Sequence, residues 1–204
     1  MSNDFWKLST GESVATTETT YEAPSGGGDY VFAEGTKVKA LIEEVRWNSY
    51  QGGEEYINLR VSVIAPETDL QGVKISNRKL FFKLWVNGDV ANSKTPEKIA
   101  KKSDNAKRLL GAINANAGNK LPNGKPTDEQ FAAALSMKTM VFRLGVYDMT
   151  ESGGKIGNWL SAVAPSTAPV EVSGQYVPKV GKVQATPAAA SSNPSYDDSD
   201  SIPF

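Results

Sequence analysis

Five stretches of the chain alternate apolar and polar residues with a period of two, which predicts half-buried β-strands. The strands are expected at residues 36–50, 54–65, 77–86, 139–149 and 156–164. Between the first two lies QGG (51–53), and between the last two lies ESGGK (151–155). Both supply the glycines that tight hairpins need, so the pattern predicts two hairpins.

Between the third and fourth strands the period becomes helical. Thr95 is a suitable N-cap, Pro96 suits the first helical position, and Glu97 places an acid in the first turn. The apolar residues that follow at helical spacing are Ile99, Ala106, Leu109, Leu110 and Ile113. The stretch AGNKLPNGKP ends this helix, and TDEQFAAALSMK predicts a second, short helix that starts at Thr127.

Three strands, a helical segment and a two-stranded hairpin form the connectivity of an OB-fold, a five-stranded Greek-key barrel. The predicted fold is therefore mainly β: an OB-fold barrel with a helical insertion between strands three and four. An immunoglobulin-like sandwich is the alternative, but it requires seven strands and no helical insertion.

Both flanks of this domain differ from it in composition. Residues 1–30 are rich in Ser, Thr and Gly, and the stretch after Ala164 is rich in Pro, Ala, Ser and Val with little apolar periodicity. Such segments bury too little surface to offset the entropy of ordering. The predicted organisation is an acidic, partly mobile arm (1–30), the OB-fold domain (31–165), a disordered linker (166–196) and an acidic protein-interaction tip (197–204).

The composition excludes much enzyme chemistry. The chain has no cysteine and no histidine, so it lacks thiolate metal sites, histidine general bases and Ser-His-Asp triads. Carboxylate-bound magnesium is the easiest remaining metal option, but Asp69, Asp89, Asp148 and Glu151 are scattered in turns. We expect a non-enzymatic protein without a metal or cofactor.

Targeting signals are also missing from the sequence. No apolar run approaches the roughly 20 residues of a membrane span, and the N-terminus lacks the basic and apolar pattern of a signal peptide. A cytoplasmic location is the simplest expectation.

The net charge of −1 conceals an uneven distribution. Residues 1–30 carry one Lys and five Asp or Glu, residues 31–166 carry 19 Lys or Arg and 14 Asp or Glu, and residues 167–204 carry two Lys and four Asp or Glu. A mildly basic centre between acidic flanks indicates an anionic partner for the centre, with possible competition from the tail.

Strand alternation assigns side chains to two faces. In the third strand, Leu80, Phe82, Leu84 and Val86 are expected to fill the core, which leaves alternating cations and aromatic rings outside. The outward and end-of-strand residues expected to bind are Arg46, Trp47, Tyr50, Tyr56, Asn58, Arg60, Lys79, Phe81, Lys83, Trp85, Arg143 and Tyr147. A β-bulge at Glu43 and Glu44 would change which of Arg46 and Trp47 faces outward.

Aromatic residues interleaved with Lys and Arg on the outer faces of strands two and three suit single-stranded nucleic acid. Unpaired bases stack on the rings while the cations follow the phosphates. The alternative is that these rings pack under the helical insertion or form a dimer interface. For the helix residues Lys98, Lys101, Lys102, Lys107 and Arg108, a solvated helix face is the simpler interpretation.

The chain ends in SYDDSDSIPF, which resembles the acidic tip of bacterial single-stranded DNA-binding proteins, a run of aspartates followed by Ile-Pro-Phe. Ser199 and Ser201 stand where the family pattern has aspartate. The long helical insertion and the acidic N-terminal arm resemble the phage-encoded members more closely. An acidic end that only aids solubility would account for the aspartates but not for Ile202, Pro203 and Phe204.

The resemblance implies a role for each part of the tip. Phe204 would fill an apolar pocket on a partner, with Ile202 beside it and Pro203 restricting the chain. Asp197, Asp198 and Asp200 would steer the tip toward basic surfaces. The implied partners are single-stranded DNA and, through the tip, proteins of replication, recombination and repair in an infected bacterial cell.

We therefore expect a protein that coats and protects single-stranded DNA with little sequence preference. A strand-annealing recombination mediator would use the same surface. An interaction adaptor that does not bind DNA, and a carboxylate-metal nuclease, are alternatives from other classes.

Overall fold

The computed structural model describes residues 4–14, 21–22, 31–49, 55–87, 95–149 and 156–177. Its strands are β1 (Tyr21–Glu22), β2 (Lys37–Ser49), β3 (Glu55–Ala65), β4 (Lys79–Leu84), β5 (Thr139–Asp148) and β6 (Ile156–Ala164). The helices are α1 (Pro96–Asn116) and α2 (Asp128–Leu135), with a short 3-10 turn η1 (Asp4–Trp6). The five strands and two helices predicted from the sequence are all present.

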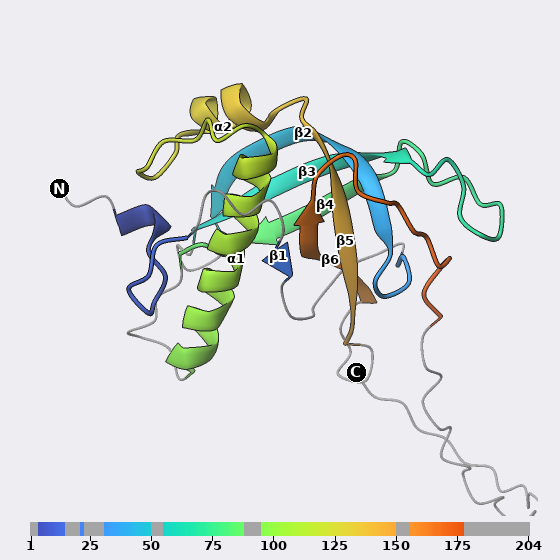
Figure 1. Ribbon diagram of the computed structural model, residues 1–204. Helices are drawn as coiled ribbons and strands as arrows, with labels where there is room; N and C mark the ends of the chain where they lie inside the picture. Colours follow the sequence, from blue (N-terminus) through green and yellow to red (C-terminus); the bar gives the residue numbers. More distant parts are fainter. Residues whose placement is uncertain are drawn as a thin grey trace, which may run out of the picture.

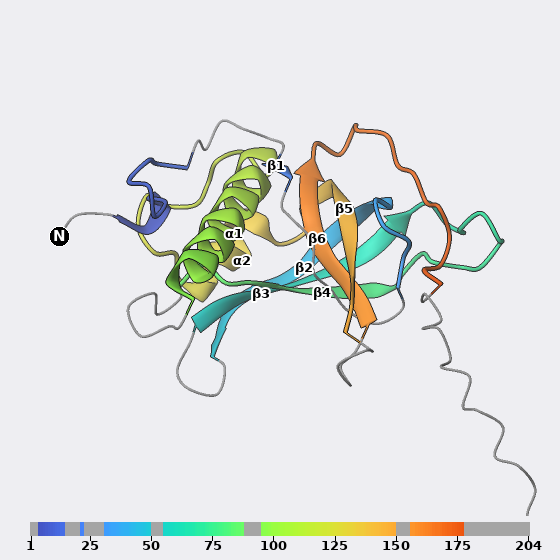
Figure 2. The same cartoon turned by 90° about the horizontal axis from the view of Figure 1, so that it is seen from below.

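The strands form one antiparallel sheet in the order β1-β6-β5-β2-β3-β4. The sheet is strongly curved, and α1 contacts β4 and β6 near its two sides (Figure 1). Figure 2 shows α1, α2 and η1 gathered at one end, whereas the connection between β3 and β4 projects from the other. The prediction of a mainly β domain with a helical insertion is confirmed.

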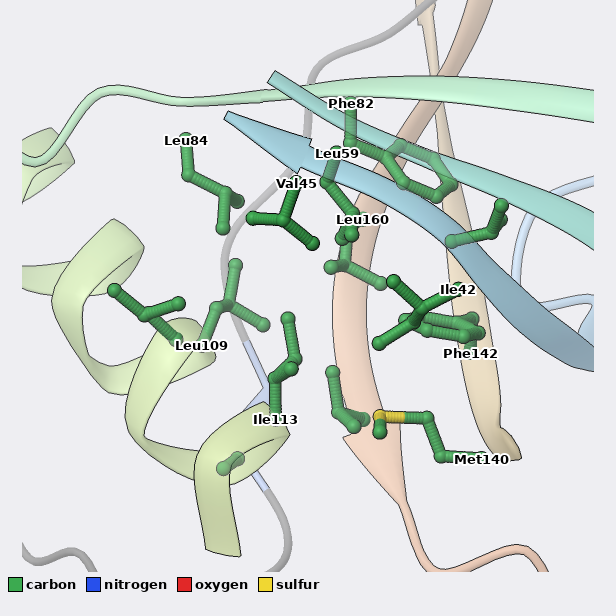
Figure 3. Close-up of a cluster of buried hydrophobic side chains, with 14 of the residues drawn as sticks. Ile42, Val45, Leu59, Phe82, Leu84, Leu109, Ile113, Met140, Phe142 and Leu160 are labelled. Atoms are coloured by element: carbon green, nitrogen blue, oxygen red, sulfur yellow. The ribbon is translucent and has the colours of Figure 1, made fainter. Parts of the chain in front are cut away.

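The core lies between the concave side of the sheet and α1. Val45, Leu59 and Leu84 from the sheet point toward Leu109 and Ile113 of α1 (Figure 3). Leu80, Phe82 and Leu84 of β4, and Val86 just after it, are buried as predicted. In β5, Met140, Phe142 and Leu144 are buried as expected, while Val146 is only half-buried.

Both helices begin where the sequence predicts. Pro96 occupies the first turn of α1 and Glu97 supplies its acid. At the start of α2, Thr127 and Gln130 form a capping box, with Gln130 N donating to Thr127 Oγ1 (3.3 Å) and Thr127 N to Gln130 Oε1 (2.9 Å).

Part of the predicted N-terminal arm is packed on the helical insertion. Trp6 is buried and donates from Nε1 to the Pro122 carbonyl (2.9 Å). Ser9 donates to the Asp104 carboxylate from both its backbone nitrogen (2.8 Å) and its hydroxyl (2.5 Å). Residues 4–14 therefore belong to the folded unit, while residues 1–3, 15–20 and 23–30 lie outside the described residues.

The linker predicted from residue 166 onward includes residues that belong to the folded unit. Glu171 and Lys37 exchange two backbone hydrogen bonds (2.6 and 2.9 Å), and their side chains form an ion pair (3.0 Å). Val172 is buried, and Tyr176 N donates to the Val31 carbonyl (2.6 Å). The start of the linker at residue 166 is wrong, because the backbone groups of Glu171, Gly174 and Tyr176 pair with residues 31–37 at the start of the domain. Residues 178–196 and the tip at 197–204 lie outside the described residues.

Candidate nucleic-acid interface

Strand pairing brings together the central members of the predicted site. On the side of the sheet that faces away from the core, Asn58 lies opposite Lys83, Arg60 opposite Phe81, and Ser62 opposite Lys79. We call this side of β2, β3 and β4 the outer face. It presents the row Lys79, Phe81 and Lys83, all exposed, beside Asn58 and Arg60, which are half-buried.

Among the described residues, Phe81 is the most accessible aromatic side chain of the outer face. It is 61% exposed, while its strand neighbours Leu80 and Phe82 are buried in the core. Regular β alternation in β4 produces this difference, since the burial pattern is strictly period two. An exposed ring between two lysines, opposite an arginine, can stack on an unpaired base while the cations meet phosphates.

A second aromatic group lies where β3 begins and β4 ends. The rings of Tyr56 and Trp85 lie 4.9 Å apart between centroids. Lys83 Nζ is 5.1 Å from the Tyr56 ring centroid, and Lys102 Nζ is 4.4 Å from that of Trp85. Tyr56 is on the outer face but buried, and Trp85 is half-buried. Base stacking at this end would therefore start from Trp85 rather than from Tyr56.

Lys102 joins α1 to this aromatic group. The sequence favoured a simple solvated helix face for the α1 lysines, yet the ammonium group of Lys102 lies over the Trp85 ring. Ser103, the next residue, donates from Oγ to the Val86 carbonyl (2.6 Å) and fixes the helix against the end of β4. A cation–aromatic contact between separate elements has no local sequence signal, so sequence reasoning missed it.

Trp47 is not on the outer face. Its ring lies 5.9 Å from Phe131 of α2 and 6.2 Å from Phe5, between centroids. Its Nε1 donates to the Pro126 carbonyl (2.8 Å), and Lys125 Nζ lies 4.4 Å from its ring centroid. The prediction that Trp47 faces a bound strand is corrected, because an irregularity in β2 turns this residue toward the core and Arg46 outward.

That irregularity is a β-bulge at Glu43 and Glu44, whose presence the sequence alone did not decide. Ile42 pairs with Val61 and Glu44 with Arg60, so Glu43 is the extra residue. Ile42 and Val45 are both buried, and the two glutamates between them lie on the outer face. The pattern Ile-Glu-Glu-Val was the available signal, since two polar residues in succession interrupt the period of two.

The two glutamates give the outer face an ion-pair network that sequence reasoning did not include. Arg60 Nε is 3.2 Å from Glu43 Oε2, and Arg60 Nη1 is 3.0 Å from Glu44 Oε2. Arg46 Nε is 3.2 Å from Glu44 Oε1, and Lys79 Nζ is paired with Glu43. Three of the predicted phosphate-binding cations are therefore held by carboxylates.

Arg143 and Tyr147 lie apart from this group. Arg143 pairs with Lys37 at the start of β2, nine residues before Arg46, which is roughly 30 Å along an extended strand. It lines a cavity of about 190 Å³ with Lys37, Ala162 and Pro169. Tyr147 is farther along β5, opposite Gly157. Tyr50 lies outside the described residues.

Trp159 is a further aromatic residue on the outward side of β6. It pairs with Gly145 of β5 and is half-buried, with its Nε1 in contact with the surface of that glycine. Sequence reasoning used the strand that contains it but did not consider it as a site residue.

The described part of the chain contains no group of three or more acidic side chains arranged to hold a metal ion. Neither α1 nor α2 is long and apolar enough to cross a membrane. Comparison of the chain with models of known protein families and with curated proteins finds no match.

Proposed function

We propose that this chain is a non-enzymatic protein that binds and protects single-stranded DNA with little sequence preference. The observation that carries the proposal is the exposed ring of Phe81, which lies between Lys79 and Lys83 and opposite Arg60. A duplex would hide its bases from such a ring, whereas a single strand offers them for stacking, and every base has a stackable face.

The arrangement of the elements supports assignment of the domain to the OB-fold. Leaving out the two-residue β1, the order β6-β5-β2-β3-β4, with α1 between β4 and β5 in the chain, is the one expected for that fold. The outer faces of β3 and β4 then correspond to strands two and three, the usual binding surface of OB-folds. The interface therefore occupies the position that the proposed fold favours.

The C-terminal tip supports a second part of the proposal. Through Ile202, Pro203 and Phe204, preceded by Asp197, Asp198 and Asp200, the chain would recruit replication, recombination and repair proteins to the coated strand. Its resemblance to the tip of bacterial single-stranded DNA-binding proteins, together with the helical insertion, favours a phage-encoded protein that acts in the cytoplasm of an infected bacterium.

Fluorescence anisotropy of labelled oligonucleotides tests the proposal. The full chain is titrated into a single-stranded oligothymidine, a mixed single strand of the same length and the corresponding duplex, each at two salt concentrations. We expect both single strands to bind at least ten-fold more tightly than the duplex and to weaken at higher salt. Equal binding of duplex and single strand would overturn the proposal. The absence of binding would also overturn it and would favour an interaction adaptor.

A further inference from the structure

The β-bulge in β2 places two consecutive carboxylates on the outer face. In a regular strand one of Glu43 and Glu44 would point into the core, between the buried side chains of Ile42 and Val45. An ionised carboxylate in that position would be strongly destabilising. The extra residue removes this conflict, and it also brings both charges beside the cations of β3 and β4.

These carboxylates hold the cations closely. Arg60 bridges the two glutamates with contacts of 3.2 and 3.0 Å, Arg46 contacts Glu44 at 3.2 Å, and Lys79 pairs with Glu43. The hydrogen bond from Lys79 holds the pKa of Glu43 below its ordinary value, and the charges of Lys79 and Arg60 add to this effect. Glu43 is therefore ionised at neutral pH and keeps its partners.

We propose that Glu43 and Glu44 compete with the phosphates of a bound strand for Arg46, Arg60 and Lys79, and so set the affinity and the salt dependence of binding. This inference rests on the proposed function. A phosphate that approaches Arg60 or Lys79 must replace a carboxylate already in contact with it. These cations then contribute less to phosphate neutralisation than their number suggests, and stacking on Phe81 carries more of the affinity.

The salt dependence of binding measures this competition directly. For single strands, log K falls with log salt at a slope of about −0.7 per neutralised phosphate. The double variant Glu43→Gln/Glu44→Gln keeps the size and hydrogen-bonding capacity of both side chains but removes their charge. We expect its affinity for oligothymidine to rise about ten-fold or more at low salt, and its slope to steepen by up to about 2 as three cations become available.

The matched control is Glu67→Gln/Glu129→Gln, which removes the same formal charge from two exposed residues outside the outer face. A second measurement introduces Lys79→Gln into the otherwise unchanged chain and into the Glu43→Gln/Glu44→Gln variant. In the otherwise unchanged chain Lys79→Gln should leave the slope nearly unaltered, whereas in the Glu43→Gln/Glu44→Gln background it should reduce the slope by about 0.7. If the double variant does not fold, the single variants Glu43→Gln and Glu44→Gln should each show part of the steepening.

The outcomes separate the two proposals. If the unaltered chain binds single strands but the double variant changes affinity and slope no more than the control does, the inference is overturned and the proposed function stands. The inference is also overturned if Lys79→Gln reduces the slope equally in both backgrounds. If the unaltered chain binds no single strand, the proposed function fails.

Discussion

The indole of Trp47 packs against the ring of Phe131, with 5.9 Å between the centroids, so the end of β2 is joined to α2. The Trp47 backbone nitrogen donates to Asp128 Oδ1 (2.7 Å), and Nε1 donates to the Pro126 carbonyl (2.8 Å). These contacts stabilise the helical insertion and leave the ring on the core side of the sheet.

Trp47→Phe should therefore lower stability without affecting the interface. The substitution keeps the ring contact but removes the donor to Pro126, which should lower the free energy of unfolding by about 1 kcal/mol. Urea-induced unfolding followed by circular dichroism measures this change. The affinity for oligothymidine should be unchanged, and a large loss of that affinity in a folded variant would contradict the placement of Trp47.

Phe81→Ala should have the opposite effect. Because the ring is 61% exposed, its removal should change the free energy of unfolding by only about 0.5 kcal/mol or less. The loss of one stacking platform should weaken binding of oligothymidine by about 1–3 kcal/mol. Leu70→Ala is the matched control, since Leu70 is also exposed but lies in the connection between β3 and β4. Equal affinities of both variants would count against the outer face as the interface.

Gly145 has no room for a side chain. A Cβ atom at this position would lie 1.7 Å from Trp159 Nε1, so Gly145→Ala should displace the indole and lower the free energy of unfolding by about 1–3 kcal/mol. Urea unfolding of Gly145→Ala in the unaltered and Trp159→Leu backgrounds checks the cause. Gly145→Ala should lower the free energy of unfolding clearly less in the Trp159→Leu background than in the unaltered chain. An equal loss in both backgrounds would show that Trp159 is not responsible.

The pairing of Glu43 with Lys79 predicts a pH-dependent contribution to stability. Because the folded-state pKa of Glu43 lies below its ordinary value, ionised Glu43 favours the folded state. This contribution is present above the ordinary carboxyl pKa of about 4.3 and is lost as the pH falls through the folded-state pKa. The difference in urea midpoint between the unaltered chain and Glu43→Gln should shrink on going from neutral to strongly acidic pH. A difference that grows on acidification would contradict this sign.

Removal of residues 197–204 should leave affinity for single-stranded DNA unchanged or increase it, because the deletion removes three aspartates from the chain. Anisotropy titrations of the full and shortened chains with oligothymidine provide the comparison. A chain in which Asp197, Asp198 and Asp200 are replaced by Asn, with Phe204 retained, separates the effect of charge from that of the apolar end. A large loss of affinity on deletion would contradict the proposed role of the tip.

Local patterns predicted the elements because each depends on nearby residues. The capping pair at Thr127 and Gln130 marks the start of α2, and the period of two in residues 79–84 correctly separates Phe81 from Phe82. The positions of the strands and helices, and most of the core, follow from such signals.

The features that could not be predicted from the sequence depend on contacts between residues far apart in the chain. Period two alone could not show whether a bulge lies at Glu43 and Glu44, and Trp47 is on one face if the bulge is present and on the other if it is absent. The contact of Lys102 with Trp85 and the position of Arg143 beside Lys37 are likewise set by tertiary packing and strand order. Composition suggested a linker from residue 166 onward, although the backbone groups of Glu171, Gly174 and Tyr176 pair with residues 31–37.

The pairing of Glu171 with Lys37 has a practical consequence for anyone who expresses part of this protein. A fragment cut at residues 31 and 165, as composition would suggest, loses the partner of the Lys37 backbone groups and the hydroxyl and amide donors that Ser9 gives to Asp104. Unpaired backbone groups at the margin of a sheet promote self-association. Expression boundaries at or before Asp4 and at or after Val177 keep these contacts and should reduce this self-association.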